Sequence, residues 1–412
     1  MKYVIIGNSA AAVGCIEGIR SVDKNVTITV LSKEPYHVYS RPLISYLLGE
    51  KTDEQRMKYR PDNFYKENKV NILLGTAADK VDYENKQVLL ENGEKIPFDK
   101  LLIATGSAPF VPPMVGLDEV EKKFSFMSLE DAKALQRELH PESRVLILGA
   151  GLIGLKCAEG ILHSVKEVAV IDLAPRILPS VLDEDGSEMI QKHIEKQGVK
   201  FYLSNSVAQF HPNTAILKDG TELAFDILVI AVGVRPETTL AADMGCNVNR
   251  GILTGEHCET NLADVYAAGD CSESLDITVN QQKVLALLPN AYMQGETAGI
   301  AMAGGEKTYD KAIPMNAVGF FGLHMITAGS YDGEAYIVHR EGYYKKIVSK
   351  DNLLKGYILI GDVVRAGIYT SLIREKTPLD SIDYELIKEK PQLMAFTAPE
   401  RAVKLGGAKH EY

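Results

Sequence analysis

The residues of this chain with the clearest potential for chemistry are glycines and an acid at the ends of short aliphatic runs. Gly149–Gly154 reads G-A-G-L-I-G and directly follows the run Val145–Leu148. In such a loop the first glycine permits a tight strand-to-helix turn, the second lets the backbone approach a pyrophosphate, and the third allows close helix–strand packing. Asp172 follows the next run, Glu167–Ile171, at about the 20-residue spacing expected for an acid that binds a ribose hydroxyl. The pattern predicts a dinucleotide-binding unit.

The same unit indicates which nucleotide it binds. The helix expected after the loop offers free backbone N–H groups and the positive end of its dipole to a phosphate. Asp172 favours a free ribose 2′-hydroxyl and therefore NADH over NADPH. Arg176 is suited to a 2′-phosphate, although an arginine in this turn is equally consistent with a structural role.

A second, less regular loop lies near the N-terminus. Gly7–Ala12 reads G-N-S-A-A-A and follows the aliphatic run Tyr3–Ile6. Alanine is tolerated at the third glycine position, but Ser9 at the second is a departure, because its Cβ stands where a phosphate would approach. By itself this loop leaves a second dinucleotide site and an ordinary turn open.

The chain after this loop offers three further polar candidates. Ser32 replaces the acid expected after the strand Val26–Leu31, and either Ser32 or Glu34 could reach a ribose hydroxyl, with Glu34 favoured. Arg41, in Y-S-R-P-L, fits a contact to a cofactor phosphate or flavin, or a surface arginine fixed by a proline turn.

Two features in the second half also admit two interpretations. Asp270 ends the run V-Y-A-A-G-D and fits either an acid that binds a polyol hydroxyl or an ordinary turn. Leu288–Tyr292 begins a helix with Pro289 in its first turn, and we expect this helix to end at Gly304-Gly305. Its N–H groups could point at an electron-rich ring edge.

Hydrophobic periodicity predicts the elements that position these residues. Further helices are expected at Ala10–Arg20, Ser128–Leu139, Leu155–Leu162 and Asp183–Gln197. Further strands are expected at Asn71–Gly75, Gln87–Leu90, Leu101–Gly106, Val199–Leu203 and Leu228–Gly233, with hairpin turns at Asn92-Gly93 and Lys218-Asp219-Gly220. The alternation of strands and helices predicts an α/β fold.

Composition narrows the class of protein. A chain of 412 residues suggests two or three domains. Its hydrophobic content of 46% and charged content of 24% are ordinary, and its net charge of −10 argues against a nucleic-acid partner. We see no long apolar run and no secretory signal, and the five cysteines are scattered, so we expect no membrane span and a reducing cytoplasm.

Five motifs in order resemble one family. G-N-S-A-A-A, A-T-G-S-A-P at Ala104–Pro109, G-A-G-L-I-G, A-V-G-V-R-P at Ala231–Pro236 and V-Y-A-A-G-D are similar to the two-dinucleotide flavoprotein reductases of the pyridine nucleotide–disulfide oxidoreductase superfamily, over about residues 1–310. The resemblance implies FAD and NADH as cofactors and two Rossmann-like, three-layer domains. The implied FAD-binding domain covers 1–113 and 236–312, the NAD-binding domain 114–235 is inserted in it, and an α+β C-terminal domain, 313–412, caps the flavin and in many relatives forms a dimer interface.

The resemblance also implies roles for individual residues. The residues matched to the FAD site are Gly7, Ser9, Ala10, Ala11, Ser32, Glu34, Arg41, Pro42, Ala78, Ala104, Thr105, Gly106, Gly269, Asp270, Pro289, Asn290 and Ala291. Those matched to the NAD site are Gly149, Gly151, Leu152, Ile153, Gly154, Asp172, Arg176 and Gly233.

The subgroup depends on one missing residue type. Members that reduce disulfides or peroxides carry a redox cysteine in the segment after the second strand, but Tyr39–Gly49 contains none. This segment, with Val318–Gly329 and Leu354–Asp362, resembles NADH:rubredoxin reductases, oxygenase reductases and the flavin part of nitrite reductases. We therefore expect an NADH-dependent flavoprotein reductase that passes single electrons to a carrier such as rubredoxin or ferredoxin. The alternatives are a subunit feeding an iron–sulfur or sirohaem partner, an NADH oxidase or coenzyme A-disulfide reductase relative, and a flavoprotein acting through partner binding.

No side chain is assigned as catalytic, and Arg41 and Lys156 are the candidates for tuning the flavin. Relatives commonly carry a glutamate at the position of Lys156, near the nicotinamide. We expect Lys156 either to pair with Glu159 on the same helix face or to lie near the reduced flavin.

Overall fold

The structure is a computed structural model that describes residues 1–406. By its internal contacts the chain divides into two compact units. The first comprises Met1–Ser180, Ile194–Leu275 and Gln281–Asp310, and the second comprises Val181–His193, Asp276–Asn280 and the described residues from Lys311 onward. Within residues 1–406, every helix is too short or too polar to cross a membrane.

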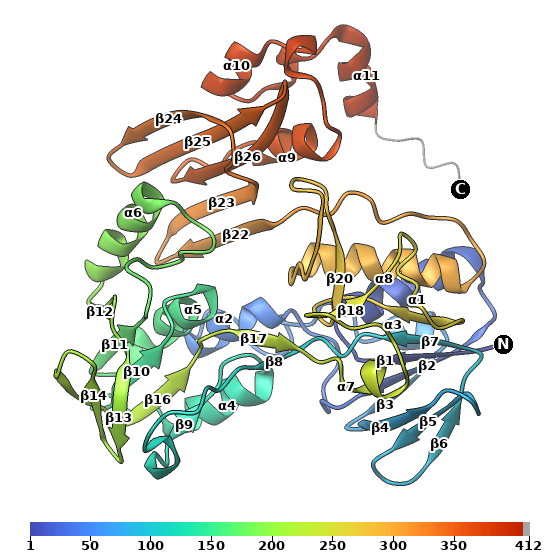
Figure 1. The fold of residues 1–412 in the computed structure, drawn as a ribbon, viewed down its shortest axis with the longest axis horizontal. Coiled ribbons are helices and arrows are strands. Elements are labelled where there is room, and N and C mark those ends of the chain that lie inside the picture. Colours follow the sequence, from blue (N-terminus) through green and yellow to red (C-terminus); the bar gives the residue numbers. More distant parts are fainter. Residues whose placement is uncertain (407–412) are drawn as a thin grey trace. The chain divides into compact units, whose positions relative to one another are not determined.

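The first unit contains a parallel sheet built around β1 (Lys2–Ile6), as Figure 1 shows. β1 pairs with β2 (Thr27–Ser32) and β7 (Lys100–Ile103), and β3 (Val70–Leu74) and β19 (Val265–Ala267) form the two edges. The three central strands are buried along most of their length, as expected for a parallel sheet covered on both faces. Their carboxyl ends meet at one edge, which is where open α/β sheets bind ligands.

Two helices lie next to this sheet, α1 (Ala10–Val22) and α8 (Leu288–Met302) (Figure 1). They cross with their backbones in contact, because a Cβ at Gly295 would lie 1.9 Å from the carbonyl oxygen of Ala11. This close crossing joins a segment near the N-terminus to one almost 300 residues later.

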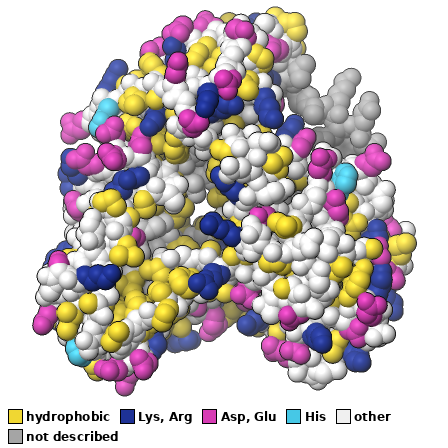
Figure 2. All heavy atoms as spheres, in the orientation of Figure 1, with side chains coloured by type: hydrophobic (Ala, Val, Ile, Leu, Met, Phe, Trp, Pro, Cys, Tyr) yellow, Lys and Arg dark blue, Asp and Glu magenta, His cyan; other side chains and the backbone are white. Residues whose placement is uncertain are grey.

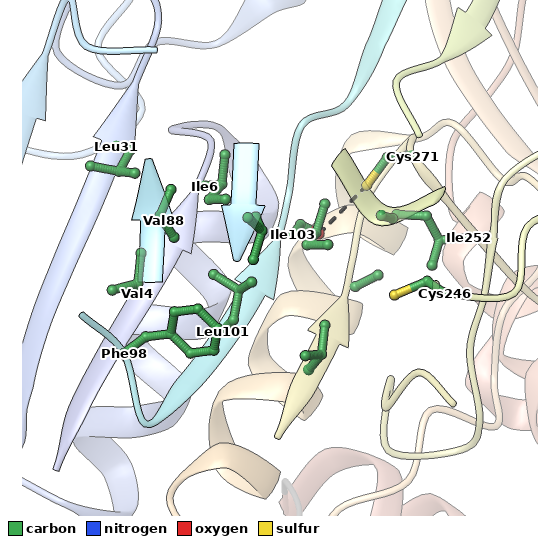
Figure 3. Packing of buried hydrophobic residues seen from close by; sticks show 14 of the residues in the cluster. Val4, Ile6, Leu31, Val88, Phe98, Leu101, Ile103, Cys246, Ile252 and Cys271 are labelled. Carbon is green, nitrogen blue, oxygen red and sulfur yellow. Dashed lines mark hydrogen bonds between the residues drawn. The ribbon is translucent and has the colours of Figure 1, made fainter. Parts of the chain in front are cut away.

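The core on the other side of the sheet is completed by three antiparallel strands, β4 (Ala78–Asp82), β5 (Gln87–Leu90) and β6 (Lys95–Pro97). Figure 3 shows Val88 and Phe98 beside side chains of β1 and β7 in this buried cluster. The sheet therefore forms the middle of three layers.

A second parallel sheet in the same unit surrounds β10 (Arg144–Leu148). β10 pairs with β11 (Glu167–Ile171) and β16 (Ile227–Ile230), and β12 (Lys200–Tyr202) and β9 (Lys123–Phe124) form the edges. Both sheets place a strand followed by a loop and a helix at their centre.

The layers beside this sheet comprise α4 (Leu129–Glu138), α5 (Leu152–Ile161) and an antiparallel sheet of β13 (Val207–His211), β14 (Thr214–Leu217) and β15 (Glu222–Ala224). Side chains of β13–β15 share a buried core with alternate residues of β10, β11 and β16.

Short elements link these layers: η1 (Arg41–Leu43), α2 (Ile44–Leu48), α3 (Phe64–Glu67), β8 (Ser107–Pro109), η2 (Leu117–Glu119), η3 (Leu162–Ser164), β17 (Val234–Pro236), α7 (Thr239–Asp243), β18 (Ile252–Leu253), β20 (Ser272–Asp276) and β21 (Gln281–Lys283). The longer helix α6 (Glu184–Glu195) belongs for most of its length to the second unit. β8 and β17 pair antiparallel.

The second unit is an antiparallel sheet with helices. The strands are β22 (Met315–Phe320), β23 (Leu323–Gly329), β24 (Glu334–Arg340), β25 (Tyr343–Lys350) and β26 (Leu353–Ile360), in the order β22-β23-β26-β25-β24. The helices are α9 (Ala366–Arg374), η4 (Leu379–Ser381), α10 (Tyr384–Glu389), η5 (Leu393–Ala395) and α11 (Ala398–Gly406). Tyr357 and Tyr369 pack in its core, with ring centroids 5.4 Å apart.

These observations confirm the predicted fold class, two parallel-sheet α/β parts and an α+β C-terminal part. Most predicted elements have the expected type, with shifted ends. The helix predicted from Leu155 begins earlier, at Leu152, because Gly151 is its extended N-cap, with φ −83° and ψ −176°. The helix predicted over Asp183–Gln197 is shorter at both ends, Glu184–Glu195.

Candidate functional site

The G-A-G-L-I-G loop forms the turn between β10 and α5. Gly149 has a φ of 107°, and a Cβ there would lie 2.3 Å from the carbonyl oxygen of Ala231. A Cβ at Gly154 would lie 2.0 Å from the carbonyl oxygen of Gly149. At Gly151, by contrast, no described atom outside its chain neighbours lies within 4 Å of the Cβ position. The fold itself therefore requires Gly149 and Gly154, whereas Gly151 borders open space in front of the first helical residues, Leu152 and Ile153.

Asp172 lies at the end of β11, beside this loop. One carboxylate oxygen accepts a hydrogen bond from the Ala150 N–H at 2.7 Å, and the other accepts one from the Ala174 N–H at 2.8 Å. The chain then folds back, because the Leu178 N–H donates to the carbonyl oxygen of Ala150 at 2.9 Å. The carboxylate thus braces the loop through one lone pair on each oxygen and retains further acceptor capacity.

Arg176 lies within the same turn. One terminal nitrogen donates to the carbonyl oxygen of Pro179 at the long distance of 3.5 Å. Its Nε atom is buried and lacks a hydrogen-bond partner within the part of the chain that the structure describes. A buried guanidinium N–H without an acceptor fits a site for an anion.

Two apolar side chains that the sequence did not single out flank the loop. Leu173, directly after Asp172, is 72% exposed, and Val232, between Ala231 and Gly233, is 39% exposed. Gly233 has a φ of 121° with open space at its Cβ position. The sequence carries no signal for these two residues, because their exposure becomes visible only in the folded structure.

The second loop has the same backbone course with different residues. Gly7 has a φ of 118°, and a Cβ there would lie 2.0 Å from the carbonyl oxygen of Ala104, so these two residues touch. Ser9 is the N-cap of α1 in an extended conformation, φ −135° and ψ −159°, which any residue adopts without strain. Ala10 and Ala11 begin the helix and are buried. The serine is thus compatible with the turn.

The second half of the chain reaches this loop through Gly269. A Cβ at Gly269 would lie 3.3 Å from the Cβ of Ala11 and 3.7 Å from the Cβ of Ala291. Its N–H donates to Gln294 Oε1 at 2.8 Å. Pro289 occupies the first turn of α8, as predicted, and Asn290 is buried. Tertiary packing thus brings together three segments that the sequence separates.

Asp270 follows directly and lies among polar groups. Its carboxylate accepts a hydrogen bond from Ser107 Oγ at 3.4 Å. Burial raises the pKa of Asp270, and the Ser107 hydroxyl and the charge of Arg41 oppose this rise. Nearby, Thr105 Oγ1 donates to the carbonyl oxygen of Glu237 at 2.6 Å, and Gly106, with a φ of 73°, borders open space.

Glu34 and Arg41 form an ion pair, with Arg41 Nη2 2.5 Å from Glu34 Oε1. The Tyr39 hydroxyl donates to the other carboxylate oxygen at 2.6 Å and accepts the N–H of Leu129 at 2.9 Å. Sequence reasoning missed Tyr39. The network joins the segment after β2 to the segment that precedes α2, and a contact of Arg41 with a cofactor stays a prediction.

The remaining flavin-side candidates lie around the end of β2. Ser32 Oγ donates to the carbonyl oxygen of Glu34 at 2.7 Å, and the Ser32 carbonyl oxygen accepts the Thr76 N–H at 2.7 Å. Ala78 begins β4 shortly after Thr76, and Pro42 is exposed in η1. Most predicted flavin-side residues thus come from segments that follow the carboxyl ends of β1, β2, β7 and β19, whereas Ala78 follows β3 and Pro289–Ala291 begin α8.

Lys156 forms the predicted pair with Glu159, within α5. Its Nζ also lies over the ring of Tyr46, 4.7 Å from the centroid. Tyr46 belongs to α2 in the segment without cysteine, and the sequence did not point to it.

All five cysteines are buried and reduced: Cys15, Cys157, Cys246, Cys258 and Cys271. Burial raises the pKa of each thiol. Cys271, next to Asp270, hydrogen-bonds the carbonyl oxygen of Ile103 inside the core, as Figure 3 shows. Cys15 lies in the core with no exposed surface.

Comparison with known proteins identifies relatives of this chain. The chain is 32% identical over 390 residues to a nitrite reductase [NAD(P)H] of Bacillus subtilis, covering 92% of this chain but only 48% of that protein. It is 30% identical over 391 residues to the NADH-dependent phenylglyoxylate dehydrogenase subunit epsilon of Aromatoleum evansii, covering 92% of each. The chain therefore spans about half of the first relative and nearly all of the second.

A solved structure and a family model extend this result. The structure of NADH:rubredoxin oxidoreductase from Clostridium acetobutylicum matches with a TM-score of 0.75 and 25% identity, covering 92% of this chain and 96% of that one. The model of the pyridine nucleotide-disulphide oxidoreductase family matches residues 1–295. This chain therefore belongs to the pyridine nucleotide-disulphide oxidoreductase family.

Proposed function

We propose that this chain is a flavoprotein reductase that transfers a hydride from NADH to FAD and then single electrons to a redox carrier protein such as rubredoxin or ferredoxin. The observation that carries the proposal is the combination of two dinucleotide loops with a segment, Tyr39–Gly49, that lacks a redox cysteine. All five thiols are buried, so none is placed to form a disulfide with a substrate.

The described residues fit both cofactors. The open space beside Gly151 and the helix start behind it suit the NADH pyrophosphate, and Asp172 suits the adenosine ribose. The buried Nε of Arg176 suits an anionic group beside this ribose. On the flavin side, Gly7, Ser9, Ala10 and Ala11 would hold the FAD pyrophosphate. Ser32 or Glu34 would bind its ribose, and Ala78 would contact the adenine through its backbone.

The flavin ring and its polyol chain would lie along the second group of residues. Asp270 would accept hydrogen bonds from the ribityl hydroxyls of FAD. These bonds would replace the hydrogen bonds to water that the buried carboxylate loses. Ala104, Thr105, Gly106 and Gly269 would line the passage, and the start of α8 at Pro289–Ala291 would face the ring edge with the positive end of the helix dipole. Pro289 carries no N–H and the Ala291 N–H donates to the carbonyl oxygen of Leu287 at 2.9 Å, so the proposal for this helix start rests on the dipole. When bound, FAD accepts two electrons as hydride and releases them singly.

The protein's own contribution is position and charge rather than proton transfer. The contact between Gly269, Ala11 and Ala291 fixes three flavin-side segments, so the ring would be held in one geometry for attack by the nicotinamide. Arg41, 39% exposed and paired with Glu34, would place a permanent positive charge near the flavin-side loop. We assign no proton-transferring residue.

Anaerobic stopped-flow spectroscopy tests the function. The yellow protein is mixed with NADH or NADPH, and the reduced protein is then mixed with rubredoxin, ferredoxin, coenzyme A disulfide or oxygen. We expect fast reduction by NADH and fast reoxidation only by a carrier protein. Slow reduction by both nucleotides, or reoxidation mainly by the disulfide, would refute the proposal.

A second candidate is the flavin subunit of a larger complex. Two matches favour it, because the chain spans only 48% of the nitrite reductase and is similar over its length to a protein named as a subunit. The scattered cysteines provide no cluster ligands, so an iron–sulfur or sirohaem centre would lie on a partner chain. Copurification of a metal-containing partner, with turnover only in the complex, would support it.

The proposal extends to organisation and location. The FAD-binding domain would comprise 1–113 and 236–312, the NAD-binding domain 114–235, and the C-terminal domain 313–412. We propose a cytoplasmic protein that forms a homodimer. Sedimentation velocity tests the oligomeric state, and a single monomeric species at micromolar concentration would contradict it.

A further inference from the structure

Lys156 of α5 contacts Tyr46 of α2, in the flavin-side segment. Its ammonium group lies 4.7 Å from the Tyr46 ring centroid and pairs with one oxygen of Glu159. Lys51 Nζ lies 3.5 Å from the other oxygen of Glu159. One carboxylate thus holds two ammonium groups, one from α5 and one from the chain after α2.

Two of these groups, Glu159 and Lys156, are largely removed from water, whereas the Lys51 side chain is 54% exposed. The Glu159 side chain is 9% exposed and the Lys156 side chain 14% exposed. The cavity among them, between Ser45, Gly49 and Gly160, has a volume of about 10 Å³, near the lower limit for one water molecule. Low solvation strengthens the cation–ring attraction and the ion pair, so this cluster is held more firmly than a surface pair.

The two helices are also in backbone contact. A Cβ at Gly160 would lie 2.7 Å from the carbonyl oxygen of Ser45, and Gly49 lies against Gly160 as well. The Cβ of Leu48 lies 3.2 Å from the same position, so α5 packs closely against α2 at Gly160, one residue after Glu159.

We propose that Lys156 is a positioning residue: its ammonium group, held between the Tyr46 ring and Glu159, fixes the nucleotide helix α5 against the flavin-side helix α2. The inference rests on the proposed function. The loop before α5 would carry the NADH, and the segment Arg41–Pro42, which leads into α2, would lie beside the flavin. The cluster then sets the gap between the two rings, to which hydride transfer is sensitive.

Its charge gives a second consequence. Lys156 contributes one positive charge to the contact between the helices. A positive charge at this place favours the more negative, reduced form of a nearby flavin. Lys156→Met should therefore lower the midpoint potential of the bound FAD, and Lys156→Arg should not.

Two matched pairs of variants test the inference. Lys156→Met removes the charge while Lys156→Arg keeps it, and Tyr46→Leu removes the ring while Tyr46→Phe keeps it. The readouts are the limiting rate of flavin reduction by NADH, the long-wavelength absorbance of the stacked nicotinamide–flavin complex, and hydrogen–deuterium exchange in peptides covering residues 44–48 and 152–161. Melting temperatures establish that each variant is folded, and the Tyr46 pair decides if Lys156→Met fails to fold.

We expect the Met and Leu variants to lose about tenfold in rate, to lose the long-wavelength band and to exchange faster in both helices. The Arg and Phe variants should behave like the parent protein. Unchanged rate, band and exchange in Lys156→Met and Tyr46→Leu would overturn the inference, and so would equal losses in all four variants.

The test of Lys156 can be distinguished from the test of the proposed function. If the parent protein is not reduced by NADH, the proposed function fails. Exchange in the two helices and the visible circular dichroism of bound FAD then decide for Lys156. Changes in Lys156→Met and Tyr46→Leu that are absent in the matched controls support it, and unchanged signals overturn it.

Discussion

Replacing Gly149 or Gly151 by alanine separates what the nucleotide loop does for the fold from what it does for a ligand. The two positions belong to one turn, and each substitution adds a single methyl group. At Gly149 the added Cβ would lie 2.3 Å from the carbonyl oxygen of Ala231, whereas at Gly151 it would meet nothing within 4 Å in the described structure. The same chemical change is therefore expected to lower stability at Gly149 and nucleotide affinity at Gly151.

The magnitudes follow from this geometry. Holding alanine at the φ of 107° found at Gly149 costs about 1–3 kcal/mol in backbone strain. The collision with rigid backbone adds to this, so Gly149→Ala should destabilise the protein by about 3–5 kcal/mol. Gly151 has an ordinary φ of −83°, and alanine at this N-cap should cost about 1 kcal/mol or less. Its methyl group would occupy the space proposed for the pyrophosphate, so NADH binding should weaken about 10–100-fold, or about 1.4–2.7 kcal/mol.

The assay combines denaturant unfolding with calorimetric titration of NAD⁺ and NADH, and FAD content serves as the control for the untouched flavin-side loop. Gly151→Ala should unfold like the parent protein and retain FAD, but bind nucleotide weakly. Parent-like nucleotide affinity in Gly151→Ala would refute the assignment of this loop. Parent-like stability of Gly149→Ala would refute the argument from the Ala231 contact.

Three further outcomes are expected. Burial raises the pKa of Asp270, so its ionised carboxylate destabilises the FAD-free protein above about pH 4. The Asp270→Asn variant should therefore have a higher melting temperature without FAD, yet bind FAD about tenfold more weakly. An unchanged FAD affinity by titration would contradict the role of Asp270. In the second unit, burial alone would raise the pKa of Asp183, but hydrogen bonds from Lys346 and Tyr344 outweigh it and lower the pKa. This stabilisation is present above about pH 4 and is lost as pH falls through the folded-state pKa. Asp183→Asn should therefore lower the free energy of unfolding by about 1–3 kcal/mol at pH 7 and by much less at pH 3. Chemical denaturation at both pH values measures this difference. Because all five thiols are buried with raised pKa values, iodoacetamide should leave the native protein unmodified by mass spectrometry and NADH-driven reduction of a carrier unchanged; loss of activity in step with alkylation would revive a cysteine mechanism.

The face of the molecule in Figure 2 carries side chains of both charge signs, interspersed with apolar ones. The net charge of −10 therefore does not specify where a carrier protein docks. Charge-swap variants of individual surface lysines and arginines, measured for salt-dependent association with the carrier, would locate the docking surface.

The sequence by itself determined the nucleotide loop at Gly149–Gly154, the α/β class and the absence of a cysteine from Tyr39–Gly49, whereas the loop at Gly7–Ala12 was assigned only through the family resemblance. Family membership confirms the predicted fold class and the predicted cofactors, FAD and NADH. These features could be predicted because a tight strand-to-helix turn restricts the residue types locally, at Gly149 as at Gly7. Hydrophobic periodicity and motif spacing can also be recognised without knowing any distant contact. The pairing of Lys156 with Glu159 was readable for the same reason, since both lie on one helix.

Only the tertiary structure decided which separated residues meet. The contacts of Gly7 with Ala104 and of Gly269 with Ala291 depend on strand order, which no local pattern encodes. Tyr39 and Tyr46 were missed because their partners, Leu129 and Lys156, lie some hundred residues away. The extended backbone of Ser9 fits the turn, and the approach of its Cβ to a phosphate stays a prediction. Local geometry thus fixed the loops, and long-range packing fixed the site that they share.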